Sequence, residues 1–599
     1  MKMPLHMSLT ALAATALLAS CATTPSRDRA MDDASAFQPI RATTHRGTDD
    51  LLTAGLGLEG LRAMSPPAFA DAVAPTPGEL RRRAIWSNWR GIADLAPGGG
   101  YADVYGTVEP VPGREYQALA TVPGATHPHR VLVQVPDNFD RQRRCVVVAP
   151  ASGSRGVLGG IAVAGPWALP KGCAVAYTDK GAGTDYFDLD AGQGVQLDGT
   201  IGGADAALAF RPHPATGSGV AVKHSHSGDN PEADWGRHVE QAARFAMHAL
   251  GEAFPDAQPF RPDNTTVIAV GISNGGGAVL RAAELEGDWL DAVVAAAPNV
   301  QVDGARPLYD YTTEAALLMP CALPVLGIPP MPTVPAHCAA LSEAGLVSGQ
   351  TLEAQQQSAY ETLRAGGWTD AALRAGSISV GFDLWRAVAV TYASAYGRFG
   401  PEDHPCGFHF AVQGADGTPR AATAAERAAW AAEGSGIPPG AGVGIIAAEG
   451  DLARPLAGLQ CLRTMWEGDS AEARRVREGI AAARATSPRT GAPVTVIHGL
   501  DDGLIPAAFT SAPYVSAARA AGADVRYWQV RNAQHFDAFL GLPAYGAHYL
   551  PLLPYVYEAL DRTWAHLQEG APMPGDAVIE TVPRGAGAAL ERRHLAMPR

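Results

Sequence analysis

The sequence has no long run of basic residues and no cysteine or histidine cluster with the spacing of a metal site. Lysine and arginine number 46 against 60 aspartate and glutamate residues, which gives a formal net charge of −14. The run Arg81-Arg82-Arg83 is short and is typical of a solvated helix face. The sequence therefore does not predict a nucleic-acid-binding protein, and it calls for neither a metal nor a cofactor.

Long apolar runs are also scarce. The stretch from Leu9 to Leu18 is too short to span a bilayer in the mature protein, and Leu18-Ala19-Ser20-Cys21 has the form of a bacterial lipobox. We expect residues 1–20 to be a cleaved lipoprotein signal peptide, with Cys21 lipidated and a lipid anchor as the sole membrane attachment. The residue after Cys21 is Ala22 rather than an aspartate, which is compatible with a location in the outer membrane of a Gram-negative cell. The predicted location is that membrane, on its periplasmic or cell-surface side, or the medium; the alternative is an ordinary signal peptide with an incidental cysteine.

Without Cys21 the chain has few cysteines: Cys145, Cys173, Cys321, Cys338, Cys406 and Cys461. An even number in an exported chain permits three disulfides. Cys321 and Cys338 enclose a proline-rich loop and are the first pair that we expect. Cys145 and Cys173 each begin a predicted strand and could pair across adjacent strands.

What is present is a large globular chain of 599 residues, 47% hydrophobic and 18% charged. Apolar strand patterns alternate with helical patterns on both sides of one long interruption, which predicts an α/β fold with a mostly parallel central sheet. The expected organisation is a tether at 21–48, a helical region at 49–125, two halves of the α/β core at 126–301 and 441–570, a mainly helical lid at 302–440, and a loose tail at 571–599. Within the second half, Gly442 to Ala447 is predicted to be its first core strand.

The chain is organised around Gly271-Ile272-Ser273-Asn274-Gly275, which follows the apolar strand pattern beginning at Thr265 and precedes a helical pattern. A Gly-x-Ser-x-Gly sequence in that context is the nucleophile elbow of an α/β-hydrolase. The sharp strand-to-helix turn presents the serine above the sheet, and the flanking glycines let strand and helix approach closely. Ser273 is therefore the predicted nucleophile.

Two further residues complete the order Ser…Asp…His that this fold uses. The sequence His498-Gly499-Leu500-Asp501-Asp502 follows a late strand, and its spacing favours Asp502 as the acid, with Asp501 as the alternative. His535, after the strand Asp524 to Val530, is the predicted base. Asp537 is too close to His535 to come from the expected strand, and we expect His498 to make a structural hydrogen bond.

The oxyanion hole needs two N–H donors. Asn274 follows the nucleophile and is one candidate; Ser152 or Gly153, in the small-residue loop after an apolar strand, is the other. His224 and His226 lie two residues apart, which is weak evidence for a metal, and we expect them in a solvated loop.

The interruption between the two halves of the core has helical patterns at Leu352 to Leu363 and Thr369 to Tyr396. An insertion at this point of the fold is where a lid is carried. Its apolar helices could line an acyl pocket, although a purely structural subdomain fits the composition equally well.

Several stretches resemble the D-(−)-3-hydroxybutyrate oligomer hydrolase family: Trp167–Gly181, Asn230–Gly236, Gly271–Leu280 and Leu550–Tyr555. The resemblance implies an α/β-hydrolase with Ser273 as nucleophile. It also implies hydrolysis of short 3-hydroxybutyrate oligomers, which are small-molecule esters, to monomer in polyhydroxybutyrate degradation. Two alternatives stay open: a tannase- or feruloyl-esterase-like enzyme acting on aromatic esters, and a non-catalytic surface-binding lipoprotein.

Overall fold

A computed structural model describes residues 36–598, apart from 416, 438–441, 448–454 and 490. The predicted signal peptide, Cys21 and the first part of the tether lie outside the described residues. Within the described ranges, no helix has both the length and the apolar character needed to cross a membrane.

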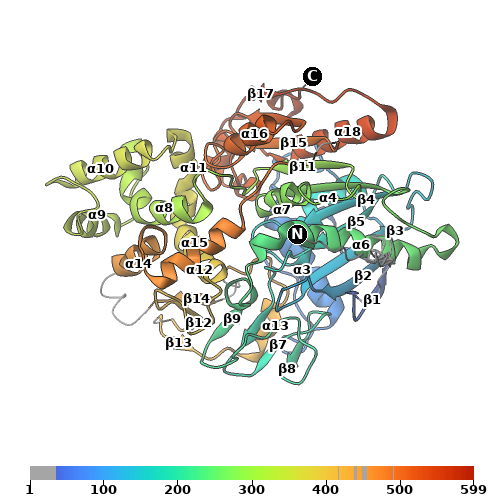
Figure 1. The fold of residues 1–599 in the computed structure, drawn as a ribbon, viewed down its shortest axis with the longest axis horizontal. Coiled ribbons are helices and arrows are strands. Elements are labelled where there is room, and N and C mark those ends of the chain that lie inside the picture. Colours follow the sequence, from blue (N-terminus) through green and yellow to red (C-terminus); the bar gives the residue numbers. More distant parts are fainter. Residues whose placement is uncertain (1–35, 416, 438–441, 448–454, 490, 599) are drawn as a thin grey trace, which may run out of the picture.

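A ten-stranded sheet forms the centre of the molecule (Figure 1). Its strands, from one edge to the other, are β1 (Arg41–His45), β2 (Gly113–Ala120), β3 (His129–Pro136), β5 (Ala174–Thr178), β4 (Cys145–Pro150), β10 (Thr266–Ile272), β11 (Ala292–Ala296), β15 (Val494–Gly499), β16 (Val525–Val530) and β17 (Ala577–Ile579). The neighbours β1/β2, β2/β3 and β3/β5 are antiparallel, and all pairs from β5 to β17 are parallel. The mostly parallel sheet that the sequence predicts is confirmed.

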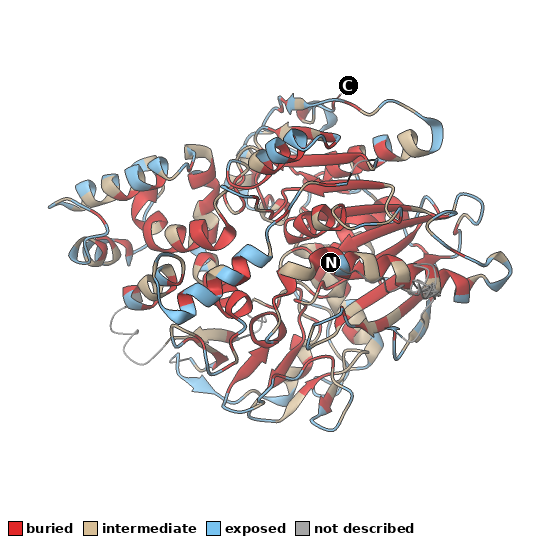
Figure 2. Ribbon diagram, viewed as in Figure 1, coloured by how far each residue is buried: buried red, intermediate tan, exposed pale blue. Residues whose placement is uncertain are grey.

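Helices cover both faces of the sheet. On one face α6 (Trp235–Ala253), α7 (Asn274–Ala282) and α16 (Ser511–Ala520) share a core with alternate side chains of the strands. On the other face α3 (Pro77–Arg90), α4 (Ile161–Ala168) and α18 (Leu553–Glu569) pack against the remaining strand side chains. The central strands are therefore buried on both sides, as Figure 2 shows, and this explains why their sequences are almost continuously apolar.

The lid forms a second body with its own apolar core, on the left of Figure 1. Its helices are α8 (Leu308–Ala322), α9 (Val334–Glu343), α10 (Leu352–Ala365), α11 (Asp370–Gly381), α12 (Leu384–Gly397), α14 (Pro455–Glu467) and α15 (Ala471–Ala482). The predicted helical stretch from Thr369 to Tyr396 is two helices, because Phe382 and Asp383 interrupt it and Asp383 has φ +57°. A left-handed residue cannot continue a right-handed helix.

The predicted core strand at Gly442 to Ala447 is wrong. β14 (Val443–Ile446) pairs antiparallel with β12 (His409–Gln413), which also pairs with β13 (Pro419–Arg420) in a three-stranded sheet outside the core. The central sheet resumes only at β15, so α14 and α15 also belong to the lid's core. A short apolar strand pattern does not specify which sheet supplies its partner.

Three strands of the central sheet lie where none was predicted. β1 lies within the predicted tether, β2 within the predicted helical region, and β17 within the predicted loose tail. β1 and β17 are the two edges of the central sheet, and β1 reads Arg41-Ala42-Thr43-Thr44-His45. β1 is mostly polar and β17 has only three residues, so neither edge strand gives a periodic apolar pattern that the sequence could reveal.

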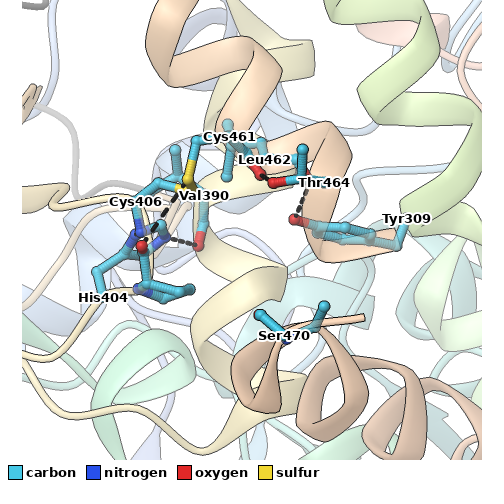
Figure 3. The surroundings of a disulfide bond; sticks show 10 residues. Tyr309, Val390, His404, Cys406, Cys461, Leu462, Thr464 and Ser470 are labelled. Carbon is cyan, nitrogen blue, oxygen red and sulfur yellow. Dashed lines mark hydrogen bonds between the residues drawn. A yellow bond between two sulfur atoms is a disulfide. The ribbon is translucent and has the colours of Figure 1, made fainter. Parts of the chain in front are cut away.

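Three disulfides are present among the described residues: Cys145–Cys173, Cys321–Cys338 and Cys406–Cys461. The first two pairings are those that the sequence favours. The third joins the segment after α12 to α14 within the lid (Figure 3). Beside it, His404 accepts a hydrogen bond from the Cys406 N–H at 3.0 Å and donates one to the Val390 carbonyl at 3.1 Å, which ties this segment to α12.

Candidate active site

Ser273 stands at the junction between β10 and α7 with φ +59° and ψ −125°, a strained conformation for a residue with a side chain. The glycines around it are sterically required. A Cβ atom on Gly271 would lie 2.2 Å from the Gly275 carbonyl oxygen, and one on Gly275 would lie 2.6 Å from that of Pro150. The turn therefore has the geometry of a nucleophile elbow, as the sequence predicts.

The structure brings Ser273, His535 and Asp502 together from three separate loops. His535 Nε2 lies 2.9 Å from Ser273 Oγ, and His535 Nδ1 lies 2.7 Å from Asp502 Oδ2. Asp502 Oδ1 accepts from the N–H groups of Leu504 and Ile505 at 2.9 and 2.7 Å. Burial acts to raise the pKa of Asp502, but the neighbouring His535 and His498 rings hold it well below the usual range. The carboxylate is thus ionised and fixed in orientation.

The other candidates near this site make different contacts. The Asp501 N–H donates to the Ala533 carbonyl at 3.1 Å, and burial raises the pKa of its carboxyl. Among the described residues no contact joins Asp501 to His535. His498 makes the structural hydrogen bond that the sequence predicts, donating from Nε2 to the Ile505 carbonyl at 2.8 Å. It thereby braces the turn that carries Asp502.

The Asp537 side chain contacts the start of α18, and it makes no hydrogen bond to His535 among the described residues. Its carboxyl group accepts from the N–H groups of Leu552 and Leu553 at 2.8 to 3.0 Å. Burial raises the pKa of Asp537 to about 7. Its contacts join the loop after His535 to the N-terminal end of α18, which is a structural role.

The predicted solvated loop around His224 and His226 is wrong. Both rings are buried in the short helix α5 (Lys223–His226). His224 Nδ1 lies 2.6 Å from Ser154 Oγ and its Nε2 lies 2.7 Å from Glu232 Oε1. The polar sequence around His224 and His226 has no apolar periodicity, so it does not predict burial. His224 is buried because the tertiary structure places hydrogen-bond partners beside it.

The buried contacts of His224 extend to Asn274 through Tyr392. His224 packs edge-on against the Tyr392 ring at 4.9 Å between centroids, and the Asn274 side-chain amide donates to the Tyr392 hydroxyl at 2.7 Å. Asn274 also accepts from the Asn299 amide at 2.9 Å. The residue after Ser273 is therefore held by a hydrogen-bonded network that sequence reasoning missed.

A cavity of about 820 Å³ opens above Ser273 and His535. Its walls come from the end of α3 and the loop after it, the loop after β4, the elbow, helices α8 and α12 of the lid, and the loop after His535. Phe382, Tyr392, Phe536 and Phe539 are its aromatic residues. The lid thus forms one wall of the cavity.

The sheet order, the elbow and the Ser–His–Asp contacts define an α/β-hydrolase. The family model of the 3HB-oligomer hydrolases matches residues 17–596. A D-(−)-3-hydroxybutyrate oligomer hydrolase of Paracidovorax citrulli is 38% identical over 92% of this chain and 90% of its own, and one of Burkholderia cenocepacia is 36% identical over 96% and 93%. This chain belongs to the 3HB-oligomer hydrolase family. Among solved structures, feruloyl esterase B of Aspergillus oryzae is 13% identical, with a TM-score of 0.38 over 84% of this chain and 90% of that one.

Proposed function

We propose that this protein is a serine esterase that hydrolyses the ester bonds of short 3-hydroxybutyrate oligomers to monomer, a late step in polyhydroxybutyrate breakdown. The observation that carries the proposal is the continuous contact from Ser273 through His535 to Asp502 on the floor of a cavity, in a chain of this family. The cavity is of the size that small-molecule sites have. Short oligomers are soluble, so no polymer-binding module is needed.

In the proposed reaction Ser273 Oγ attacks the ester carbonyl carbon while His535 Nε2 takes the hydroxyl proton. The proton then passes to the alkoxide oxygen, and the alcohol end of the cleaved bond departs as a hydroxy acid. Water, deprotonated by His535, hydrolyses the acyl-enzyme and releases the second product. Asp502 stabilises the imidazolium that forms in both steps and maintains the tautomer with the proton on Nδ1.

The oxyanion of each tetrahedral intermediate needs two donors. Asn274 begins α7, where the backbone N–H has no acceptor within the helix. In the loop after β4, the Ser152 N–H donates to the Gly159 carbonyl at 3.4 Å, whereas the Gly153 N–H has no acceptor among the described residues. Gly153 has φ +51° and its carbonyl accepts from Lys180 Nζ at 2.5 Å. These contacts favour the N–H groups of Asn274 and Gly153 as the pair.

A second candidate is hydrolysis of aromatic esters. Its support is the aromatic cluster at the cavity, in which the Phe539 ring lies 4.9 Å from Phe536 and 5.6 Å from Phe382 between centroids. Such a cluster can hold a planar ring. The same cluster also provides apolar surface for the methyl branches of hydroxybutyrate, so the substrates must be compared directly.

Product analysis distinguishes the two. Purified protein is incubated with 3-hydroxybutyrate dimer and trimer, a galloyl ester and a short p-nitrophenyl ester, and the products are separated by chromatography. We expect monomer from dimer and trimer with a kcat/KM well above that for the galloyl ester. Cleavage of the galloyl and p-nitrophenyl esters without cleavage of the dimer would support serine esterase activity and contradict the proposed substrate.

We also propose that the protein is exported and anchored through a lipid on Cys21. Support comes from the lipobox at Leu18 to Cys21 and from the three disulfides, which persist in oxidising compartments. In a Gram-negative host, the full chain should fractionate with membranes, and Cys21→Ser should move it to the soluble exported fraction. Membrane association that is unchanged in Cys21→Ser would contradict the anchor.

A further inference from the structure

Arg155 lies in the loop after β4 and has no counter-ion among the described residues. Its side chain is partly exposed and lines the cavity above Ser273. Its Nη1 donates to the Gly434 carbonyl at 3.3 Å and its Nη2 to the Gly91 carbonyl at 3.1 Å. Among the residues that the structure places, no carboxylate pairs with it, and burial lowers the pKa of Arg155 to about 10. The guanidinium therefore remains a cation at neutral pH with no carboxylate beside it in the described part of the chain.

The chain leaves specific room for this guanidinium. A Cβ atom on Gly91 would lie 2.1 Å from Arg155 Nη2, and one on Gly434 would lie 2.7 Å from Nη1. Gly91 ends α3, and Gly434 lies in the segment after α13 (Ala424–Trp430). The arginine is thus seated between two glycines from segments far apart in the sequence.

Two other largely buried arginines, Arg81 and Arg130, are neutralised by carboxylates. Arg81 contacts Glu115 at 2.7 Å and Asp49 at 3.0 Å, and Arg130 contacts Asp185 at 2.8 Å. Removing a charge from water without a partner is costly, so a protein retains such a charge when a ligand supplies the partner. Arg155 has no such partner among the described residues, which points to an anion that binds in the cavity.

The rest of the cavity lining strengthens this inference. Arg90 also faces the cavity, and its donors meet only the Leu61 and Arg62 carbonyls and Met64 Sδ among the described residues. The carboxyl group of Asp94, which also belongs to the lining, lies 3.7 Å from Arg584, and burial raises its pKa to about 6. The lining as a whole carries more positive than negative charge.

We propose that Arg155 binds the free carboxylate at the acid end of the oligomer, with Arg90 adding to the positive field. This inference rests on the proposed function. Every linear 3-hydroxybutyrate oligomer ends in a carboxylate, and in the dimer only a methine and a methylene separate that group from the scissile ester oxygen. Arg155 lies on the same loop as Gly153, so the carboxylate site adjoins the reacting ester. A planar guanidinium fits a carboxylate in two parallel hydrogen bonds.

The test compares the dimer as free acid with its methyl ester, which has the same scissile bond and no charge. We expect the wild type to favour the free acid in kcat/KM, and Arg155→Met to lower that preference about tenfold or more, mainly through KM, as loss of a hydrogen-bonded charge pair does. Arg155→Lys should retain part of the preference. Arg82→Met, at an exposed arginine of α3 outside the cavity, is the matched control and should leave the preference unchanged.

Gly91→Ala provides a second variant, because its methyl group would displace the guanidinium while every charge is kept. It should lower the same preference even if Arg155→Met folds poorly. An equal preference in the wild type, Arg155→Met and Gly91→Ala would overturn the carboxylate site while the proposed function stands. Cleavage of a p-nitrophenyl ester with no cleavage of either dimer would overturn the proposed function, and this inference with it.

Discussion

Ser273→Ala should lower kcat for the 3-hydroxybutyrate dimer by about 10⁴-fold or more, since without the Oγ atom no acyl-enzyme can form. Among the described residues, the Ser273 hydroxyl forms a hydrogen bond only with His535, so its removal should leave the fold unaffected. Alanine retains a Cβ atom at the positive φ of the elbow, and the backbone strain should therefore be similar. Initial rates on dimer, together with thermal unfolding of both proteins, make the measurement.

Ser218→Ala, at an exposed serine remote from the cavity lining, is the control and should retain wild-type rates. A Ser273→Ala variant with full activity would exclude this residue as the nucleophile. A fluorophosphonate probe gives an independent readout: the wild type should be labelled and Ser273→Ala should not. A wild-type protein that neither reacts with the probe nor cleaves any ester would favour the non-catalytic binding lipoprotein.

Asp502→Asn should lower kcat by about 10⁴-fold, whereas Asp501→Asn should change it only a few-fold. The side-chain amide that replaces the Asp502 carboxylate would fit the same space, and its oxygen could still accept from Leu504 and Ile505. The amide could not neutralise the imidazolium of His535, and its NH₂ group would favour the wrong tautomer. Asp501 makes no contact with His535 within the described part of the chain.

The two neighbouring aspartates serve as controls for each other, because they occupy the same loop and receive the same substitution. The measurement is kcat and KM on dimer for both variants, with the melting temperature as a check on folding. If Asp501→Asn proved the more damaging, the role of the acid would pass to Asp501, and the loop would have to rearrange when substrate binds.

The agreement between sequence and structure is best where a pattern is local. The sequence predicts the buried strands β4, β5, β10, β15 and β16, because a run of β-branched and apolar residues between turn residues is typical of a buried strand. The edges of the sheet were missed for the opposite reason. β1 and β17 are short, and each is a strand only because a neighbour offers a free edge.

The lid is predicted from the point where strand and helix patterns stop alternating, and no motif marks its ends. Its extent is therefore less well determined by the sequence. β14 has the pattern of a core strand, yet its partner is β12 in the lid. His224 likewise lies in a polar stretch of sequence, and it is buried because Ser154 and Glu232, from other segments, form hydrogen bonds with its ring. In both cases the residue type limits the kinds of partner that are possible, and the tertiary structure determines which partner is present.

For this protein, the sequence by itself determined the α/β-hydrolase class, the elbow at Ser273, and a short list that contains His535 and Asp502, because each depends on spacing along the chain. Only the tertiary structure decided that Asp502 and not Asp501 faces His535, that the Gly153 N–H is free among the described residues while Ser152 is engaged, and that Arg155 has no described carboxylate beside it. These are statements about which groups from distant segments come within a few ångströms of one another. Hydrogen bonds and desolvation act over that range, and chain order does not encode it.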